Sequence, residues 1–231
     1  MMREQIPVEK WVADMFGKRV GEPPQPWVEG DDPVWTFDAD ESFSQLSPER
    51  KIELLTEAFE RSGELMAPFS DAQINQALWW SVAGSGSEYI HAISDESVPW
   101  VKRRRAVWSF VALFEEVMAK RCTETLSDMD ESPASPLNSF CYMWWDSTPL
   151  CSSRVFDKES PLNVECLAVM ERILRIPHVA CQESALHGLG HWKFDHPAEV
   201  EKIIDEFLTR ERNLRPDLIS YAEAAKTGCI Q

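Results

Sequence analysis

One stretch decides the fold: Ala180-Cys-Gln-Glu-Ser-Ala-Leu-His-Gly-Leu-Gly-His-Trp192, followed by His196-Pro197 and an amphipathic run to residue 208. It predicts two short helices joined by a tight turn. Ala185 and Gly188 keep one side of the first helix small, so a neighbour can approach closely. Pro197 suits the start of the second helix, where a missing N–H costs nothing. Such a pair cannot bury its apolar faces alone, so it predicts a stack of similar pairs.

Helix-start signals recur along the rest of the chain. Four starts place a serine at or next to a proline, which supplies an N-cap and a first position with fixed φ: Ser47-Pro48, Ser97-Val98-Pro99, Ser135-Pro136 and Ser160-Pro161. Strand signals are nearly absent: there is no sustained alternation of apolar and polar residues, and no Asn-Gly or Asp-Gly pair of the kind that forms a hairpin turn. We therefore expect an all-α chain of about nine or ten helices, stacked as an irregular α-solenoid of the HEAT or armadillo kind.

Residues 1–46 are expected to form an N-terminal helix, over 7–17, and an extended arm. Residues 21–45 hold four prolines, many acids and several large aromatic residues, among them Trp27, Trp35 and Phe37. Flexible linkers rarely carry two tryptophans. We expect the arm to pack on the helical body, so that residues 1–231 form one domain, a size that can bury a sizeable core.

Charge and cysteine usage limit the function classes. The chain has 23 basic and 39 acidic residues and a net charge of −16, which disfavours nucleic acid and anionic membranes and suits a basic partner. No apolar run is long enough to span a bilayer, and the start has no signal-peptide core. Six cysteines without a C-x-x-C pair are typical of buried free thiols, so we expect a cytoplasmic protein.

Two stretches resemble known families. Residues 179–208 resemble a HEAT-type repeat, with a small-residue first helix that ends in a Leu-Gly step and a second helix carrying Val200, Ile203, Ile204 and Phe207. The strings 137–146 and 182–192 are similar to those of a bacterial protein family of unknown function. The resemblance implies a scaffold whose concave surface binds a macromolecule.

One stripe of residues could bind a metal. Glu183, His187 and His191 are spaced four and four, so they lie on one side of a helix, roughly opposite Cys181. Two histidines at i and i+4 can chelate zinc, and the carboxylate one turn away could be a third ligand. The alternative is a polar face with ordinary hydrogen bonds, turned toward solvent or a neighbouring unit. The order of residues is not that of the zinc-protease H-E-x-x-H motif.

Tryptophans and one basic run could form a partner-binding surface. Trp100 and Trp108 lie near Arg104 in the run 102–105 and are candidates for cation–π contacts. Trp144 and Trp145 cannot share one narrow face, so they line either a groove or the core. The alternative for the basic run is ion pairing with carboxylates such as those of residues 95 and 96.

We expect a non-enzymatic cytoplasmic interaction module that binds a protein or peptide partner, with no catalytic residue and no nucleic-acid or membrane contact. An immunity-type protein that neutralises a basic toxin is one version, since acidic surfaces steer basic partners. The main alternative is a metal-binding protein or metal-dependent hydrolase that uses Glu183, His187 and His191, with zinc as the cofactor. A small-ligand binder with a tryptophan-lined pocket is a third possibility. Cysteine catalysis is disfavoured because His187 and Cys181 lie on different faces.

Overall fold

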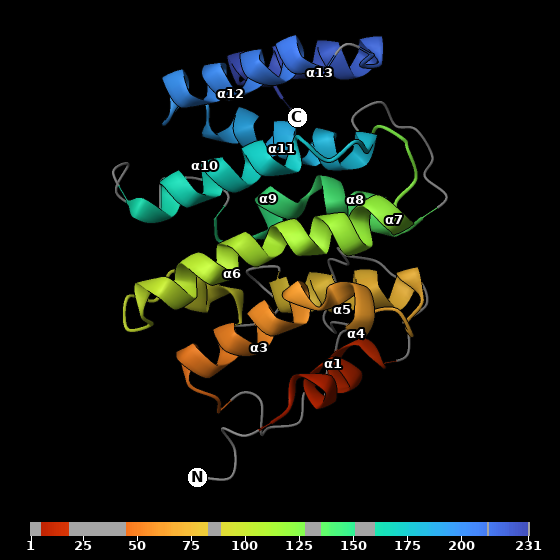
Figure 1. The fold of residues 1–231 in the computed structure, drawn as a ribbon, viewed down its shortest axis with the longest axis vertical. Coiled ribbons are helices and arrows are strands. Elements are labelled where there is room, and N and C mark those ends of the chain that lie inside the picture. The colour runs from red at the N-terminus through yellow and green to blue at the C-terminus, as the bar shows by residue number, and fades with distance from the viewer. Residues whose placement is uncertain are drawn as a thin grey trace, which may run out of the picture.

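The chain folds into layers of helices that follow one another in sequence order. The computed structural model describes residues 6–18, 45–82, 89–127, 135–150, 160–211 and 213–230, and these contain helices and no strand. In Figure 1 the layers rise from α1 at the bottom to α12 and α13 at the top. The expected all-α class is therefore confirmed for this part of the chain.

The helices have the following bounds. The first layers contain α1 (Val8–Phe16), α3 (Pro48–Glu60), α4 (Ser62–Leu65), α5 (Asp71–Val82) and the 3₁₀ turn η2 (Ile90–Ile93). The middle contains α6 (Trp100–Leu113), the π-helical segment η3 (Phe114–Met118), α7 (Ala119–Arg121), α8 (Leu137–Tyr142) and α9 (Trp144–Ser147). The last layers contain α10 (Pro161–Ile173), α11 (Val179–Trp192), α12 (Pro197–Arg210) and α13 (Pro216–Thr227).

Several helix ends form through the capping contacts that the sequence predicts. The side chains of Ser47 and Ser160 accept backbone N–H bonds in the first turns of α3 and α10. Ser70 and Gln73 bond reciprocally, side chain to backbone N–H, as a capping box does. Gly228 ends α13 with φ of 77°, a left-handed conformation that glycine adopts without steric cost.

Three expected helices are interrupted, so the chain is more segmented than the sequence predicts. The helix after Ser47 breaks between α3 and α4, and the helix after Ser135 breaks between α8 and α9. The helix expected over 97–121 begins at Trp100 and passes through the π-helical η3 before α7. The arm over residues 21–45, with its aromatic residues, lies almost wholly outside the described residues.

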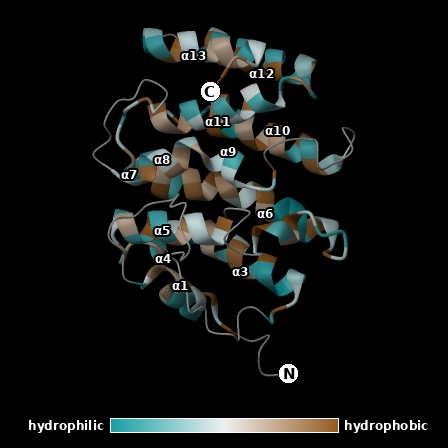
Figure 2. Ribbon diagram, turned by 180° about the vertical axis from the view of Figure 1, so that it is seen from behind, coloured by the Kyte–Doolittle hydropathy of each residue, from teal (hydrophilic) through white to brown (hydrophobic). Residues whose placement is uncertain are grey.

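The core is centred on α11. Every residue from 180 to 190 is buried, because α11 packs against α8, α9, α10, α12 and α13. The close approach of α9 depends on Gly188, whose missing Cβ leaves room for the ring of Trp145. The outer α12 carries both hydrophobic and hydrophilic segments (Figure 2) and buries one face. The second predicted helix of the deciding stretch is thus amphipathic, whereas the first is enclosed on all sides.

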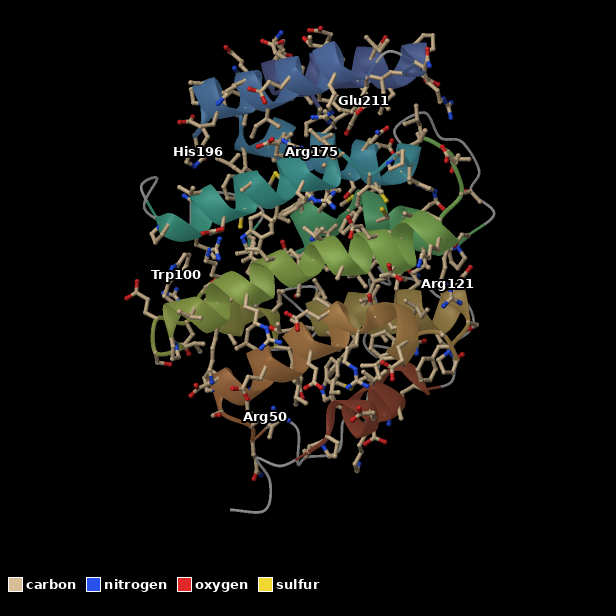
Figure 3. The ribbon with its side chains drawn as sticks, viewed as in Figure 1. Arg50, Trp100, Arg121, Arg175, His196 and Glu211 are labelled. Atoms are coloured by element: carbon tan, nitrogen blue, oxygen red, sulfur yellow. The ribbon has the colours of Figure 1, made fainter. Side chains whose placement is uncertain are left out.

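Polar contacts also tie the layers together. Arg121, at the end of α7, bonds the Asp71 carboxylate and the carbonyls of Met66 and Phe69. It lies at the edge of the molecule beside α5 (Figure 3). None of the helices in the described ranges combines the length and apolar composition that a bilayer crossing needs.

Candidate metal centre

Two imidazoles and one carboxylate meet where α9 and α11 cross. His187 and His191 lie one turn apart on α11, and Asp146 comes from the short α9. Within the described residues, these three form the one group of His, Cys, Asp or Glu side chains whose ligand atoms lie together, all within 4.8 Å of one another. Nitrogen and carboxylate donors in this combination suit a first-row transition metal.

The three donor groups are in direct contact. His187 Nε2 lies 2.8 Å from Asp146 Oδ2, and His191 Nε2 lies 2.9 Å from Asp146 Oδ1. The two Nε2 atoms are 3.2 Å apart. Because these nitrogens face each other and the same carboxylate, their lone pairs can converge on a single cation.

A pair of tyrosines supports the buried histidine. His187 Nδ1 lies 2.7 Å from the hydroxyl of Tyr221 on α13, which in turn donates to the hydroxyl of Tyr142 at 3.3 Å. The ring of Tyr142 packs on that of His187 with centroids 4.2 Å apart. When Nδ1 donates to Tyr221, the Nε2 lone pair is free for a metal. Metal-bound histidines usually have such a partner, which fixes the tautomer and the ring orientation.

The electrostatics of the cluster keep Asp146 charged. Burial raises the pKa of this carboxyl, but hydrogen bonds and charge interactions with His187 and His191 outweigh burial and hold the pKa well below its ordinary value. Asp146 therefore stays an anionic ligand throughout the physiological range.

The structure places Asp146, and not the expected Glu183, beside the two histidines. Glu183 is 1% exposed, and its Oε2 accepts the backbone N–H of Ser127 at 3.0 Å, on a segment that follows α7. It is not part of the cluster of ligand atoms. Glu183 and His187 face different segments because α11 has neighbours on all sides, so residues one turn apart on it need not share a neighbour. The two histidines keep their expected pairing.

The sequence contained only an indirect signal for Asp146. It is 41 residues from His187, at the end of one of the two strings whose family resemblance is described above. Helical periodicity relates residues of one helix only, so it could not bring α9 to α11. The stripe was expected to face solvent or a neighbouring unit. Glu183 and His187 face neighbouring helices and segments and are 1% exposed, whereas the side chain of His191 is 38% exposed.

The basic run is used in ion pairs between helices. Lys102 pairs with Glu49 and Glu53 of α3, Arg105 pairs with Glu60 of α3, and Arg104 pairs with Glu165 of α10. The ion-pairing alternative therefore describes these cations. The partners are carboxylates of neighbouring helices. The pKa of Asp95 is lowered mainly by hydrogen bonds from Ser97 and to a smaller extent by the charge of Arg103.

The four tryptophans considered above as binding residues divide into two groups. Trp144 and Trp145 are fully buried and surrounded by other rings, so they belong to the core and do not line an exposed groove. Trp100 and Trp108 are half-buried on α6 and lie under Arg103 and Arg104, with guanidinium-to-ring distances of 5.4 and 5.8 Å. Trp100 marks the outer end of α6 in Figure 3.

A second polar group lies in the core at the start of α11. Cys141 makes hydrogen-bonding contacts with Cys122 and Cys181, and Cys181 also faces His178, the N-cap residue of α11. The contact with Cys141 lowers the pKa of Cys181 to about 7, with burial opposing and His178 assisting. All three thiols are buried and none of the described cysteines forms a disulfide. The imidazole facing Cys181 is thus that of residue 178, a pairing that the sequence did not reveal.

Comparisons of the chain with models of protein families, with curated proteins and with solved structures found no match.

Proposed function

We propose that this chain is a metal-binding protein whose centre holds one divalent transition metal between Asp146, His187 and His191. The observation that carries the proposal is the convergence of two Nε2 atoms and a carboxylate, with separations of 2.8 to 3.2 Å. The hydrogen bond of Tyr221 to the far nitrogen of His187 supports it. Metal-bound histidines commonly have such a partner on the far nitrogen.

Zinc and iron(II) are the metals that the donor set favours. Imidazole suits zinc, copper, iron and nickel, while carboxylate suits harder ions, and a two-histidine, one-carboxylate set occurs in both zinc hydrolases and iron(II) sites. The thiol cluster of Cys122, Cys141 and Cys181 is separate from this group and supplies no ligand to it.

Metal analysis tests the proposal. Full-length chain without an affinity tag is incubated with Zn²⁺ or, without oxygen, Fe²⁺, desalted and analysed for bound metal. We expect about one equivalent in the wild type and loss of it in His191→Ala, a position where the half-exposed ring allows truncation without a core cavity. Glu183→Gln is the matched control and keeps the metal. A folded wild type that retains neither metal, or equal retention in His191→Ala, contradicts the proposal.

We also propose how the helical layers are organised and where the protein is located. We propose that the layers form an irregular α-solenoid of one domain, because many helices adjacent in the chain also contact one another, among them α1 and α3, α10 and α11, α11 and α12, and α12 and α13. A reducing cytoplasm is the proposed location, supported by described cysteines that are all unpaired.

A protein or peptide partner remains a second candidate function, on a face of α6 and α10. Val101 and Val164 are 76% and 63% exposed, and they flank the contact between Arg104, Trp108 and Glu165. Exposed apolar residues beside aromatic and arginine side chains favour a binding surface. An acidic peptide suits the arginines here, whereas a basic partner, as for an immunity-type protein, would bind through the acidic residues that give the chain its net charge of −16.

The partner proposal is tested by comparing charge insertions. Val101→Lys with Val164→Lys is expected to abolish co-purification of a native-host partner and its cross-links to α6 and α10. Ile219→Lys, at a 40% exposed position on α13, is the matched control and keeps the partner. A partner retained by the double variant, or lost equally from the control, contradicts this surface.

A further inference from the structure

We infer that the metal centre is open on its outer side and accepts a carboxylate-bearing small molecule as an additional ligand. This inference rests on the proposed function, because it concerns the same three residues. The cluster holds its cation from one side, with His187 innermost and Asp146 and His191 toward the surface.

The separations of the donor atoms fit adjacent positions of an octahedron. With metal–ligand bonds of about 2.1 Å, neighbouring donors are about 3.0 Å apart in an octahedron and about 3.4 Å apart in a tetrahedron. The measured separations are 2.8 Å from His187 Nε2 to Asp146 Oδ2, 2.9 Å from His191 Nε2 to Asp146 Oδ1 and 3.2 Å between the two Nε2 atoms. The two oxygens of Asp146 and the two nitrogens can fill at most four of the six octahedral positions, which leaves at least two positions for other ligands.

The burial of the three residues shows which side of the cluster faces solvent. His187 is 1% exposed and is backed by Tyr221 and Tyr142, so protein closes the inner side. Asp146 and His191 are 24% and 38% exposed in their side chains, so the outer side meets solvent. Within the described ranges, no fourth His, Cys, Asp or Glu joins the group. The outward positions are thus directed at solvent and at molecules that arrive from it.

Charge selects the class of ligand. A divalent ion with one carboxylate and two neutral imidazoles has a net charge of +1, so an anionic oxygen donor is favoured over a neutral one. A carboxylate with a neighbouring oxygen donor can fill two adjacent positions. The chain's net charge of −16 opposes anions at long range, but at physiological salt its field is screened within about 8 Å. The local ion therefore dominates once the ligand reaches the site.

Cobalt(II) as the bound metal and oxalate as the ligand test the inference. Six-coordinate cobalt(II) absorbs weakly in the visible range and four-coordinate cobalt(II) strongly, so the spectrum of the loaded full-length chain reports the geometry. We expect a weak spectrum that shifts saturably with oxalate while cobalt stays on the protein, as checked by desalting and metal analysis. Glu183→Gln is expected to respond like the wild type.

The outcomes separate the two proposals. Stoichiometric cobalt with a strong spectrum that oxalate leaves unchanged shows a closed site and overturns the inference, while metal binding stands. Removal of cobalt by oxalate without a ternary complex overturns it as well. A folded chain that binds no cobalt, zinc or iron overturns the proposed function itself.

Discussion

Gly188 lies directly against the indole of Trp145: a Cβ atom on this glycine would be 2.6 Å from Cγ and 2.7 Å from Cδ1 of the ring. Trp145 is fully buried and immediately precedes Asp146, while Gly188 immediately follows His187. The packing of one ring on one glycine therefore sets how closely the carboxylate of α9 approaches the imidazoles of α11. Core packing and the candidate metal centre are linked at this contact.

Gly188→Ala is expected to destabilise the fold and weaken the metal centre. Alanine raises intrinsic helix stability by about 1 kcal/mol over glycine, but overpacking a rigid core contact costs about 1–3 kcal/mol. The ring of Trp145 cannot move away freely because Phe110 and α11 enclose it. We expect a net loss of up to about 2 kcal/mol in urea denaturation, together with weaker zinc binding because α9 shifts.

Gly190→Ala is the matched control on the same helix. There the new Cβ meets Cδ1 of Ile230 at 2.6 Å, the far end of a flexible side chain close to the end of the chain. That side chain can rotate away, so the helix-propensity gain of about 1 kcal/mol offsets the contact and the variant is near neutral. Equal destabilisation by the two alanines would show that the contact with Trp145 is not special.

Glu165 joins α10 to α6 through two different donors. Its carboxylate accepts from the indole N–H of Trp108 and from Arg104, both at 2.5 Å, and its side chain is 17% exposed. Glu165→Gln keeps an acceptor for the indole but loses the charge-assisted bond, so we expect a loss of about 1 kcal/mol at pH 7. Glu165→Ala also leaves the indole N–H unpaired and is expected to cost more.

The effect of Glu165→Gln should depend on pH. Burial raises the pKa of this carboxyl, but Trp108 and Arg104 outweigh it and lower the pKa in the folded state. A lowered folded-state pKa contributes stability above the unfolded value of about 4.3 that is lost as pH falls through the folded value. The difference in unfolding free energy between wild type and Glu165→Gln should therefore be constant near neutrality and shrink below about pH 4. A difference that grows on acidification would refute this assignment.

Arg121 should not be replaceable by lysine. Its guanidinium bonds the carboxylate of Asp71 and two carbonyl oxygens, of Met66 and Phe69, in three directions at once. An ammonium lacks the planar fork and the reach for all three acceptors. We expect Arg121→Lys to lower the unfolding free energy by about 1–2 kcal/mol, since it removes the side-chain donor to the Phe69 carbonyl and weakens the contacts with Asp71 and Met66. Lys120→Arg, at the exposed neighbouring position, is the control and should be neutral. Thermal denaturation of both variants decides the matter.

The sequence predicted where helices begin better than it predicted the breaks and contacts that depend on tertiary packing. Capping is local chemistry, so Ser47 and Ser160 marked helix starts correctly without any tertiary information. The break between Tyr142 and Trp144 was missed because it carries no proline or glycine. Tertiary contacts, not local propensity, favour a break at such a position.

The candidate site was half predictable for the same reason. His187 and His191 share a helix, and spacing alone places them together. Choosing between Glu183 and Asp146 as the third group required knowing that α9 packs across α11. That contact depends on the fit of Gly188 to a tryptophan ring, which no helical periodicity encodes.

Tyr221→Phe should weaken metal binding without removing a ligand. The hydroxyl is 2.7 Å from His187 Nδ1, and its loss leaves that buried nitrogen without its partner and the ring free to adopt the other tautomer. Loss of such outer partners costs about 10- to 100-fold in metal affinity. Competition with a chromogenic chelator measures zinc affinity, and we expect a decrease of about tenfold, or about 1.4 kcal/mol. Tyr142→Phe keeps the ring packing and the hydrogen bond between His187 Nδ1 and Tyr221, so it should lose less. Unfolding in the presence of EDTA separates the two roles: a tyrosine that only supports the fold would lower stability there and leave zinc affinity at the wild-type value.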